Sequence, residues 1–294
     1  MSGFPGRVAV VTGAGSGIGR GLALGLARRG ARLAICDIDE AGLAETAARA
    51  EQFGAKVLTA RVDVSDAGAV AGFADEVVAR FGVVNQVYNN AGIAFNKTIL
   101  DSDLEQYERV LGVNLWGVIH GTKAFLPHLI ASGEGHVVNI SSLNGFMAQS
   151  EMSHYCASKF AVRGFTETLR AEMTDARHPV SVTCVHPGGV RTEIATNALE
   201  LMREGGLPIT AADEARRRVY NEKLLRMSPD RAADIILEAV ARDRPRVLVG
   251  SDAKGVDLGV RAFPALYPRV AATVMKVILA TGRRRARRPM AART

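Results

Sequence analysis

Short apolar runs rich in β-branched residues alternate with longer helical patterns over roughly the first 190 residues. Most positions of each run are apolar, which is typical of strands covered by helices on both faces of a sheet. We therefore expect a parallel sheet built from βαβ units. The expected strands are Arg7–Thr12, Arg32–Cys36, Lys56–Val62, Gln86–Tyr88, Gly135–Ser141 and Val180–His186. The expected helices are centred on 18–29, 40–53, 67–81, 103–131 and 155–176.

Residues 190–228 interrupt this alternation. They carry a cluster of charges at 214–218 and a Gly205-Gly206 break, and they show no strand pattern, so we expect a mobile, partly helical excursion over the sheet. A helix over 229–242 and a strand at Arg246–Gly250 restore the α/β order. The chain should therefore divide into one α/β domain at 1–250, a C-terminal helical extension at 251–280 and a flexible, Arg-rich tail at 281–294.

Composition narrows the class of protein. A chain of 294 residues with 48% hydrophobic and 23% charged residues is not disordered, and it fits one large domain or two small ones. Cys36, Cys156 and Cys184 lack metal-ligand spacing, so we expect buried thiols in a reducing compartment and no metal site. The apolar run from Val8 is broken by glycines and lacks a charged leader, which favours a cytoplasmic protein.

The net charge of +7 is concentrated at the end of the chain, where residues 283–294 hold six arginines and no acid. The rest carries about +1, so we expect a solvated tail and no nucleic-acid binding. Arg269, Lys276 and Arg283 recur every seven residues from the C-terminal extension into the tail, beside an apolar helical face. That helix could cover its own core, pack on a partner subunit or make a peripheral membrane contact through 263–294. The first two alternatives are favoured.

A glycine-rich turn follows the first expected strand. Gly13, Gly17 and Gly19 match the pattern T-G-x-x-x-G-x-G that starts at Thr12. Glycines allow the backbone to approach a pyrophosphate, and the following helix offers unpaired N–H groups and the positive end of its dipole. An ordinary strand-to-helix turn remains the alternative.

Asp37 lies at the end of the second expected strand, 18 residues after Gly19. A dinucleotide-binding fold places the group that meets the adenosine ribose there. A carboxylate accepts hydrogen bonds from ribose hydroxyls and repels a 2′-phosphate, which favours NAD over NADP. Arg20 and Arg32 oppose this interpretation, because either could approach a phosphate.

Tyr155 and Lys159 are four residues apart in an expected helix and therefore share one face. A phenol has a pKa of about 10, and one nearby cation lowers it by roughly 1–3 units. Lys159 could thus help Tyr155 to exchange a proton with an alcohol or carbonyl group. Ser142 follows the preceding strand and could hold the substrate oxygen. The plain alternatives are a surface ion-dipole pair and a strand-end cap.

Together these motifs resemble the short-chain dehydrogenase/reductase family over residues 5–250. The resemblance implies a doubly wound parallel sheet, the Rossmann fold, with helices on both faces and a substrate loop at 190–228. It implies that Tyr155 is the acid/base, that Lys159 binds the nicotinamide ribose and lowers the phenol pKa, that Ser142, 13 residues before Tyr155, orients the substrate and that Asn114 holds a relay water. The implied cofactor-binding residues are Gly13, Ser16, Gly17, Ile18, Gly19, Asp37, Asp63, Val64, Asn90, Ala91, Gly92, Tyr155, Lys159, Pro187, Gly188, Val190 and Thr192.

The resemblance implies hydride transfer between NAD(H) and a secondary alcohol or ketone. It also implies a homodimer or homotetramer formed through the helices at 103–131 and 155–176. Apolar candidates for the substrate wall favour a moderately hydrophobic compound, and they are Leu143, Phe146, Met147, Met152, Phe95, Leu199, Leu201 and Met202. An NADP-dependent carbonyl reductase and a non-catalytic dinucleotide-binding regulator with a basic tail remain alternatives.

Overall fold

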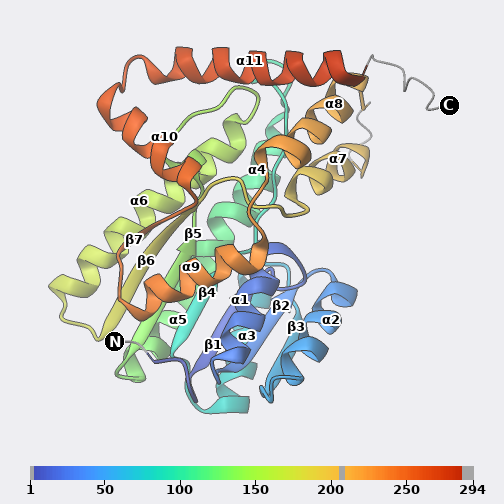
Figure 1. Ribbon diagram of the computed structural model, residues 1–294. Coiled ribbons are helices and arrows are strands. Elements are labelled where there is room, and N and C mark those ends of the chain that lie inside the picture. Colours follow the sequence, from blue (N-terminus) through green and yellow to red (C-terminus); the bar gives the residue numbers. More distant parts are fainter. Residues whose placement is uncertain (1–2, 205–208, 287–294) are drawn as a thin grey trace.

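The computed structural model describes residues 3–204 and 209–286. Its centre is a seven-stranded parallel sheet in the order β3-β2-β1-β4-β5-β6-β7, with helices on both faces (Figure 1). The strands are β1 (Val8–Thr12), β2 (Arg32–Asp37), β3 (Val57–Arg61), β4 (Gln86–Asn89), β5 (Gly135–Ile140), β6 (Val180–Pro187) and β7 (Arg246–Val249). The expected doubly wound fold is confirmed.

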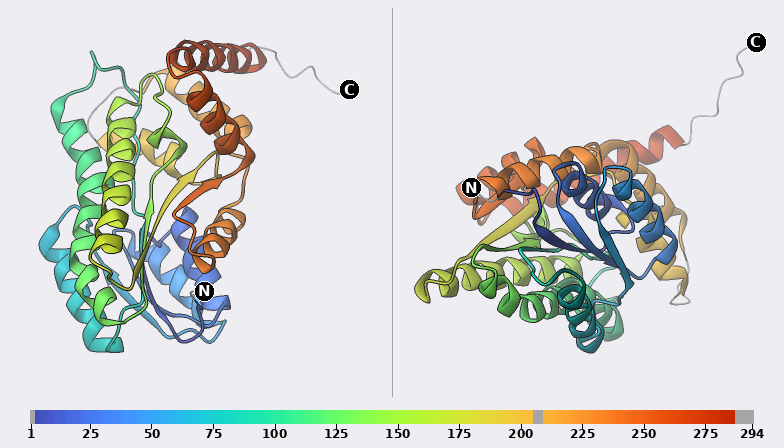
Figure 2. Two further views of the ribbon diagram at one scale, coloured as in Figure 1. Left: turned by 90° about the vertical axis from the view of Figure 1, so that its left-hand side faces the viewer. Right: turned by 90° about the horizontal axis from the view of Figure 1, so that it is seen from below.

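Two apolar layers enclose the sheet. One layer contains α1 (Gly17–Arg28), α2 (Glu40–Glu51) and α9 (Pro229–Ala241). The other contains α3 (Ala67–Phe81), α5 (Gly117–Ala131) and α6 (Ser153–Asp175). Figure 2, seen from below, shows the sheet between the two layers. Strands β1, β4 and β5 are buried at every position, so helices cover both faces of these strands as expected.

Strand β3 departs from that expectation. It forms one edge of the sheet, and Thr59 and Arg61 are exposed. An edge strand has a neighbour on one side only, and polar or charged residues there discourage pairing with another chain. The prediction that every strand is covered on both faces is therefore wrong for this one.

The expected helix at 103–131 is divided into three parts. Helix α4 (Leu104–Leu111) leads into a π-helical turn (Gly112–Trp116) and then into α5. A π-helical turn accommodates one extra residue per turn and is frequent at functional sites. Here it carries Asn114, which is fully buried.

Most of the segment 190–228 is helical. It contains α7 (Ile194–Glu204), α8 (Ala211–Val219) and a second π-helical turn (Tyr220–Leu224). The C-terminal extension consists of two helices, α10 (Ser251–Ala262) and α11 (Tyr267–Ala286). Helix α11 thus runs six residues past the expected start of the tail at 281, and residues 287–294 lie outside the described residues.

Helix α11 crosses the end of the molecule at the top of Figure 1 and packs on α8. It therefore covers the side of the fold on which the segment 190–228 lies. Of the helices described, none combines the length and hydropathy needed to cross a membrane.

Candidate active site

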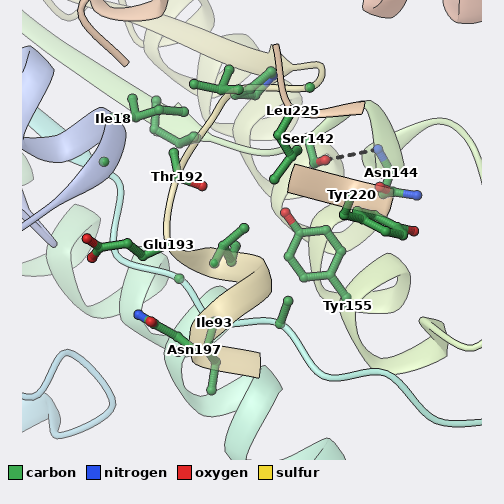
Figure 3. A pocket seen from close by; sticks show the side chains of 18 of the residues that line it. Ile18, Ile93, Ser142, Asn144, Tyr155, Thr192, Glu193, Asn197, Tyr220 and Leu225 are labelled. Atoms are coloured by element: carbon green, nitrogen blue, oxygen red, sulfur yellow. Dashed lines mark hydrogen bonds between the residues drawn. The ribbon is translucent and has the colours of Figure 1, made fainter. Parts of the chain in front are cut away.

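A cavity of about 1070 Å³ opens beyond the carboxyl ends of β1, β4, β5 and β6. The sheet order reverses between β1 and β4, and open α/β sheets bind ligands at such a point. The cavity is lined by all the expected site residues except Gly19 and Asn114. Figure 3 shows side chains from several elements converging on it.

The glycine-rich turn forms one wall of the cavity. Gly13 has a φ of +65°, and a Cβ there would lie 2.7 Å from the Cα of Ala91. A Cβ on Gly19 would overlap the carbonyl oxygen of Gly13, so Gly19 allows the helix to pack against the turn and does not face the cavity. Ser16 precedes α1, and its side chain makes no capping hydrogen bond. The first N–H groups of α1 are therefore available to an anion.

Asp37 lines the cavity beside this turn. Its carboxylate accepts hydrogen bonds from the backbone N–H of Gly15 at 2.7 Å and of Asp39 at 3.0 Å. The turn thus holds a negative charge at this end of the cavity.

Neither arginine that could compensate Asp37 lines the cavity. Arg20 donates to the carbonyl of Gly15 and to the hydroxyl of Thr46, and it pairs with Glu45. Arg32 begins β2, at the opposite end of the strand, and donates to the carbonyl of Gly6. Both guanidinium groups are therefore occupied by contacts within the chain.

The Asn90-Ala91-Gly92 segment is tied to the glycine-rich turn. The hydroxyl of Thr12 accepts the N–H groups of Asn90 and Ala91 at 3.0 Å, and the Asn90 amide donates to the Thr12 carbonyl at 2.9 Å. Asp63 lines the cavity next to Val64, and its carboxylate accepts from the backbone and the hydroxyl of Ser65. The contacts of Thr12 with Asn90 and Ala91 hold the carboxyl ends of β1 and β4 together.

Tyr155 and Lys159 lie on one face of α6, and both are buried. The Lys159 ammonium lies 5.7 Å from the centre of the Tyr155 ring and donates to the carbonyl of Ile140 at 3.0 Å. The side chains of Tyr155 and Ser142 point into the same space in Figure 3. The neighbouring Ser141 also lines the cavity, but its hydroxyl donates to the Lys159 carbonyl at 2.8 Å.

Burial controls the protonation of this pair. It raises the pKa of Tyr155 to about 12, and the hydrogen bond with Ser142 is the main influence that lowers it. Burial also lowers the pKa of Lys159 to about 8. In the structure, the Ser142 hydroxyl opposes the effect of burial on the phenol pKa. The expected effect of Lys159 on that pKa stays a prediction.

Asn114 lies behind the cavity and does not line it. Its amide donates to the Ile93 carbonyl at 2.9 Å and to the Ser158 hydroxyl at 3.1 Å, and its oxygen accepts the Ile93 N–H at 2.8 Å. A Cβ on Gly92 would touch both Asn114 and Lys159, so the three residues meet. Asn114 therefore positions the segment after Gly92 rather than facing the cavity.

The Pro187-Gly188-Gly189 segment is held by Asp252, at the start of α10. The Asp252 carboxylate accepts the Gly189 N–H at 2.6 Å, and a Cβ at Gly188 or Gly189 would overlap neighbouring atoms. The sequence analysis missed Asp252, because no local pattern connects residues 63 positions apart.

The expected substrate wall is partly wrong. Leu143, Met147, Met152 and Leu199 line the cavity, but Phe95, Phe146, Leu201 and Met202 do not. Phe95 and Phe146 are buried against His154 and His186, respectively. Phe95 also shares an apolar cluster with Met202, and Leu201 packs against that cluster. The sequence could not separate pocket from packing among these apolar residues.

Polar residues and the C-terminal helices complete the wall. Gln149 donates to the Tyr220 hydroxyl, and Arg216 of α8 pairs with Glu151. Met275 of α11 also lines the cavity. The outer wall is therefore more polar than expected, and it includes residues for which we assigned no role.

Comparisons with known proteins agree with this geometry. The sequence model of the short chain dehydrogenase family matches residues 7–202. The chain is 52% identical over 281 residues to a Mycobacterium tuberculosis protein named "Putative oxidoreductase SadH", covering 94% of this chain and 98% of the relative. It is 34% identical over 274 residues to dehydrogenase/reductase SDR family member 7B of Bos taurus, covering 90% and 80%.

Among solved structures, a short-chain dehydrogenase/reductase from Burkholderia phymatum in complex with NAD matches over 100% of both chains. The TM-score is 0.79 and the sequence identity is 31%. Sequence, fold and cavity thus lead to the same conclusion, and the chain belongs to the short-chain dehydrogenase/reductase family of oxidoreductases.

Proposed function

We propose that the protein is an NAD-dependent oxidoreductase that interconverts a secondary alcohol and a ketone. The observation that carries this proposal is the convergence of the Tyr155 phenol and the Ser142 hydroxyl in one cavity, with Lys159 buried beside them. A carbonyl oxygen placed between the two hydroxyls would accept a hydrogen bond from each. When bound, the nicotinamide ring supplies or accepts the hydride at the carbon of that group.

The residues of the cavity fit a dinucleotide. Its pyrophosphate would meet the first N–H groups of α1 between Ser16 and Gly19, and its adenosine ribose would meet Asp37. Asp63, Val64 and Asn90–Gly92 would line the remaining adenosine side, whereas Pro187–Thr192 would cover the nicotinamide. Lys159 would bind the nicotinamide ribose.

The position of Asp37 supports NAD over NADP. A 2′-phosphate would meet its carboxylate, and Arg20 and Arg32 are occupied elsewhere. The presence of NAD in the Burkholderia phymatum relative is consistent with this preference.

Proton transfer is assigned to Tyr155. With a pKa of about 12, the phenol is protonated near neutrality, so it is ready to donate a proton to a developing alkoxide during reduction. Alcohol oxidation requires that pKa to fall, and the Ser142 hydroxyl and the positive ring of an oxidised nicotinamide would act in that direction. Asn114 holds the backbone of Ile93 next to Gly92, and the relay water that the family resemblance assigns to Asn114 is part of this proposal.

The wall composition favours a moderately hydrophobic substrate with some polar character. Leu143, Met147, Met152 and Leu199 would contact its apolar part. Gln149 and Tyr220 offer hydrogen-bonding groups in the same cavity.

A panel of secondary alcohols and ketones, assayed with NAD(H) and NADP(H), tests the proposal. Tyr155→Phe should lower turnover roughly 10²–10⁴-fold, because it removes the proton donor and leaves the ring in place. Its NAD affinity should remain nearly unchanged. Turnover equal to that of the unaltered protein would refute the role of Tyr155, and a higher kcat/KM with NADP would refute the role of Asp37.

We also propose a homodimer or homotetramer formed through the helices at 103–131, which are α4 and α5, and through α6. Leu104, Trp116 and Phe160 are large apolar side chains on this side of the fold, and all three are exposed. A second copy would cover them. Phe160→Asp should yield a monomer in sedimentation equilibrium, and Phe53→Asp is the matched control. A Phe160→Asp protein with unchanged mass in solution would exclude this interface.

We also propose a cytoplasmic location. The three free, buried cysteines support this location.

A further inference from the structure

The C-terminal helices expose a cluster of large apolar side chains. Leu258 on α10 is 71% exposed, and Phe263, just after α10, is 63% exposed. Leu266, Val270 and Val274 are each about half exposed. Single exposed apolar residues are ordinary, but five within 17 consecutive residues indicate an interaction surface. We call these five residues the docking face.

Helix α11 separates two kinds of surface. At about 100° per residue, its inner face carries Tyr267, Ala271 and Met275. Met275 lines the cavity, and the Tyr267 hydroxyl accepts the Ala148 N–H at 3.4 Å. The next face around the helix carries Leu266, Val270 and Val274, and Arg269 and Lys276 lie on its far side. One side of α11 therefore belongs to the cavity wall, whereas the other is exposed.

The sequence that carries the docking face is rich in positive charge, although Arg261 pairs with Asp257 beside Leu258. The sequence contains no aspartate or glutamate after Asp257, whereas residues 258–294 contain nine lysines and arginines. Arg269 and Lys276 are exposed beside the apolar stripe of α11. Such a surface would repel a second copy of itself, and a nucleic acid would leave the apolar side chains uncovered. An anionic lipid surface satisfies both features.

A second segment reaches the same end of the molecule. The connection between β4 and α4 reaches the end of the molecule that α11 crosses, but the left view of Figure 2 shows the two on opposite sides of that end. It carries Ile99 and Leu100, which are 72% and 96% exposed. This connection is separate from the docking face.

We infer that α10 and α11 dock the protein on an anionic lipid surface through the docking face. The exposed valines and leucines enter the headgroup region, and Arg269 and Lys276 contact the lipid phosphates. Since Met275 and Val256 of the same helices line the cavity, docking brings the cavity close to the lipid. This inference goes beyond the proposed function and does not depend on turnover.

Sedimentation with vesicles tests the docking. The full chain should sediment with vesicles of phosphatidylglycerol and phosphatidylcholine, but not with phosphatidylcholine alone, and added salt should release it. Val270→Asp and Arg269→Glu should each lower the partition coefficient by about tenfold. The matched controls are Phe53→Asp and Lys56→Glu, since both residues are exposed and belong to the connection between α2 and β3, which lies away from α11 (Figure 1). The controls should partition like the unaltered protein.

Three outcomes would overturn the inference. The first is equal binding to neutral and anionic vesicles, and the second is unchanged binding of the Val270→Asp and Arg269→Glu proteins. The third is a dimer that Val270→Asp converts to a monomer without any change in vesicle binding. Thermal unfolding of each variant checks that it is folded. We expect little change in Tm, because substitutions at exposed or half-exposed positions usually cost little stability. No assay here measures oxidation or reduction, so failure of the docking leaves the proposed function untouched.

Discussion

Ser141 and Ser142 are adjacent serines that provide a matched test of the proposed chemistry. Both are buried, and each hydroxyl makes a hydrogen bond to the backbone: Ser141 donates to the Lys159 carbonyl at 2.8 Å, and Ser142 accepts the Asn144 N–H at 3.1 Å. The proposed function requires only the Ser142 hydroxyl to meet the substrate oxygen. Alanine at either position removes the same atom from the same loop.

The expected losses of stability are small and similar. A buried hydrogen bond contributes about 1 kcal/mol to the free energy of unfolding, and the Lys159 carbonyl still accepts an N–H from its own helix in Ser141→Ala. For a chain of this size, about 1 kcal/mol lowers Tm by roughly 2 °C. We therefore expect both variants to be folded at assay temperature.

The expected losses of activity differ greatly. Removing one preorganised donor to a developing oxyanion lowers kcat by about 10²–10³-fold, which corresponds to roughly 3–4 kcal/mol. Ser142→Ala should show this loss, together with a further rise in the pKa of Tyr155, because the Ser142 hydrogen bond now holds that pKa down. Ser141→Ala should retain kcat within a fewfold of the unaltered enzyme.

Steady-state kinetics, thermal unfolding and NAD titration of both variants make the comparison. NAD affinity should change little in either. Equal losses of kcat in two folded variants would mean that position 142 has no special contact with the substrate. A selective loss in Ser141→Ala would reverse the assignment.

Three further predictions concern the cofactor loop and the buried charges. Asp37→Asn should raise kcat/KM with NADP relative to NAD by about tenfold, measured with one substrate, because it removes the charge that repels a 2′-phosphate; an unchanged ratio would contradict this. Gly189→Ala should weaken NAD binding about tenfold in a fluorescence titration, because its Cβ would overlap the Leu224 carbonyl, and Gly164→Ala, which meets open space, is the control. Burial depresses the pKa of Lys159 to about 8 from 10.5, so the unfolded chain binds more protons between these values. The free energy of unfolding of the unaltered protein, compared with that of Lys159→Met, should therefore increase by up to about 3 kcal/mol as the pH rises from about 8 to 10.5. Urea titrations at several pH values measure this difference. A difference that does not change with pH would be inconsistent with a depressed pKa.

Local sequence patterns predicted the sheet because its strands carry their own signal. β-Branched apolar runs and the helices between them defined most element ends within two residues, as for β1 and α3. The π-helical turn at Gly112–Trp116 was missed, because one extra residue within a helix changes the hydrophobic period too little to detect.

The chemistry-bearing residues were predictable where they form short motifs. Tyr155 with Lys159, and the glycines with Asp37, lie within or next to single elements. Contacts between distant segments carry no such signal. Asp252 holds Gly189, and Arg216 meets Glu151, only because the chain folds back over the cavity. For the same reason the sequence could not sort Phe146, which is buried away from the cavity, from Met147, which lines it.

Helices α8 and α11 contribute to the cavity from a different part of the sequence than the acid/base residues do. Substrate preference and reaction type therefore depend on different parts of the chain. The groups assigned to proton exchange all precede residue 160, whereas Arg216, Tyr220 and Met275 come from the last third. Mutations in that last third can therefore alter which compounds enter without disturbing the acid/base apparatus. Divergence among relatives should thus change substrate preference more readily than reaction type.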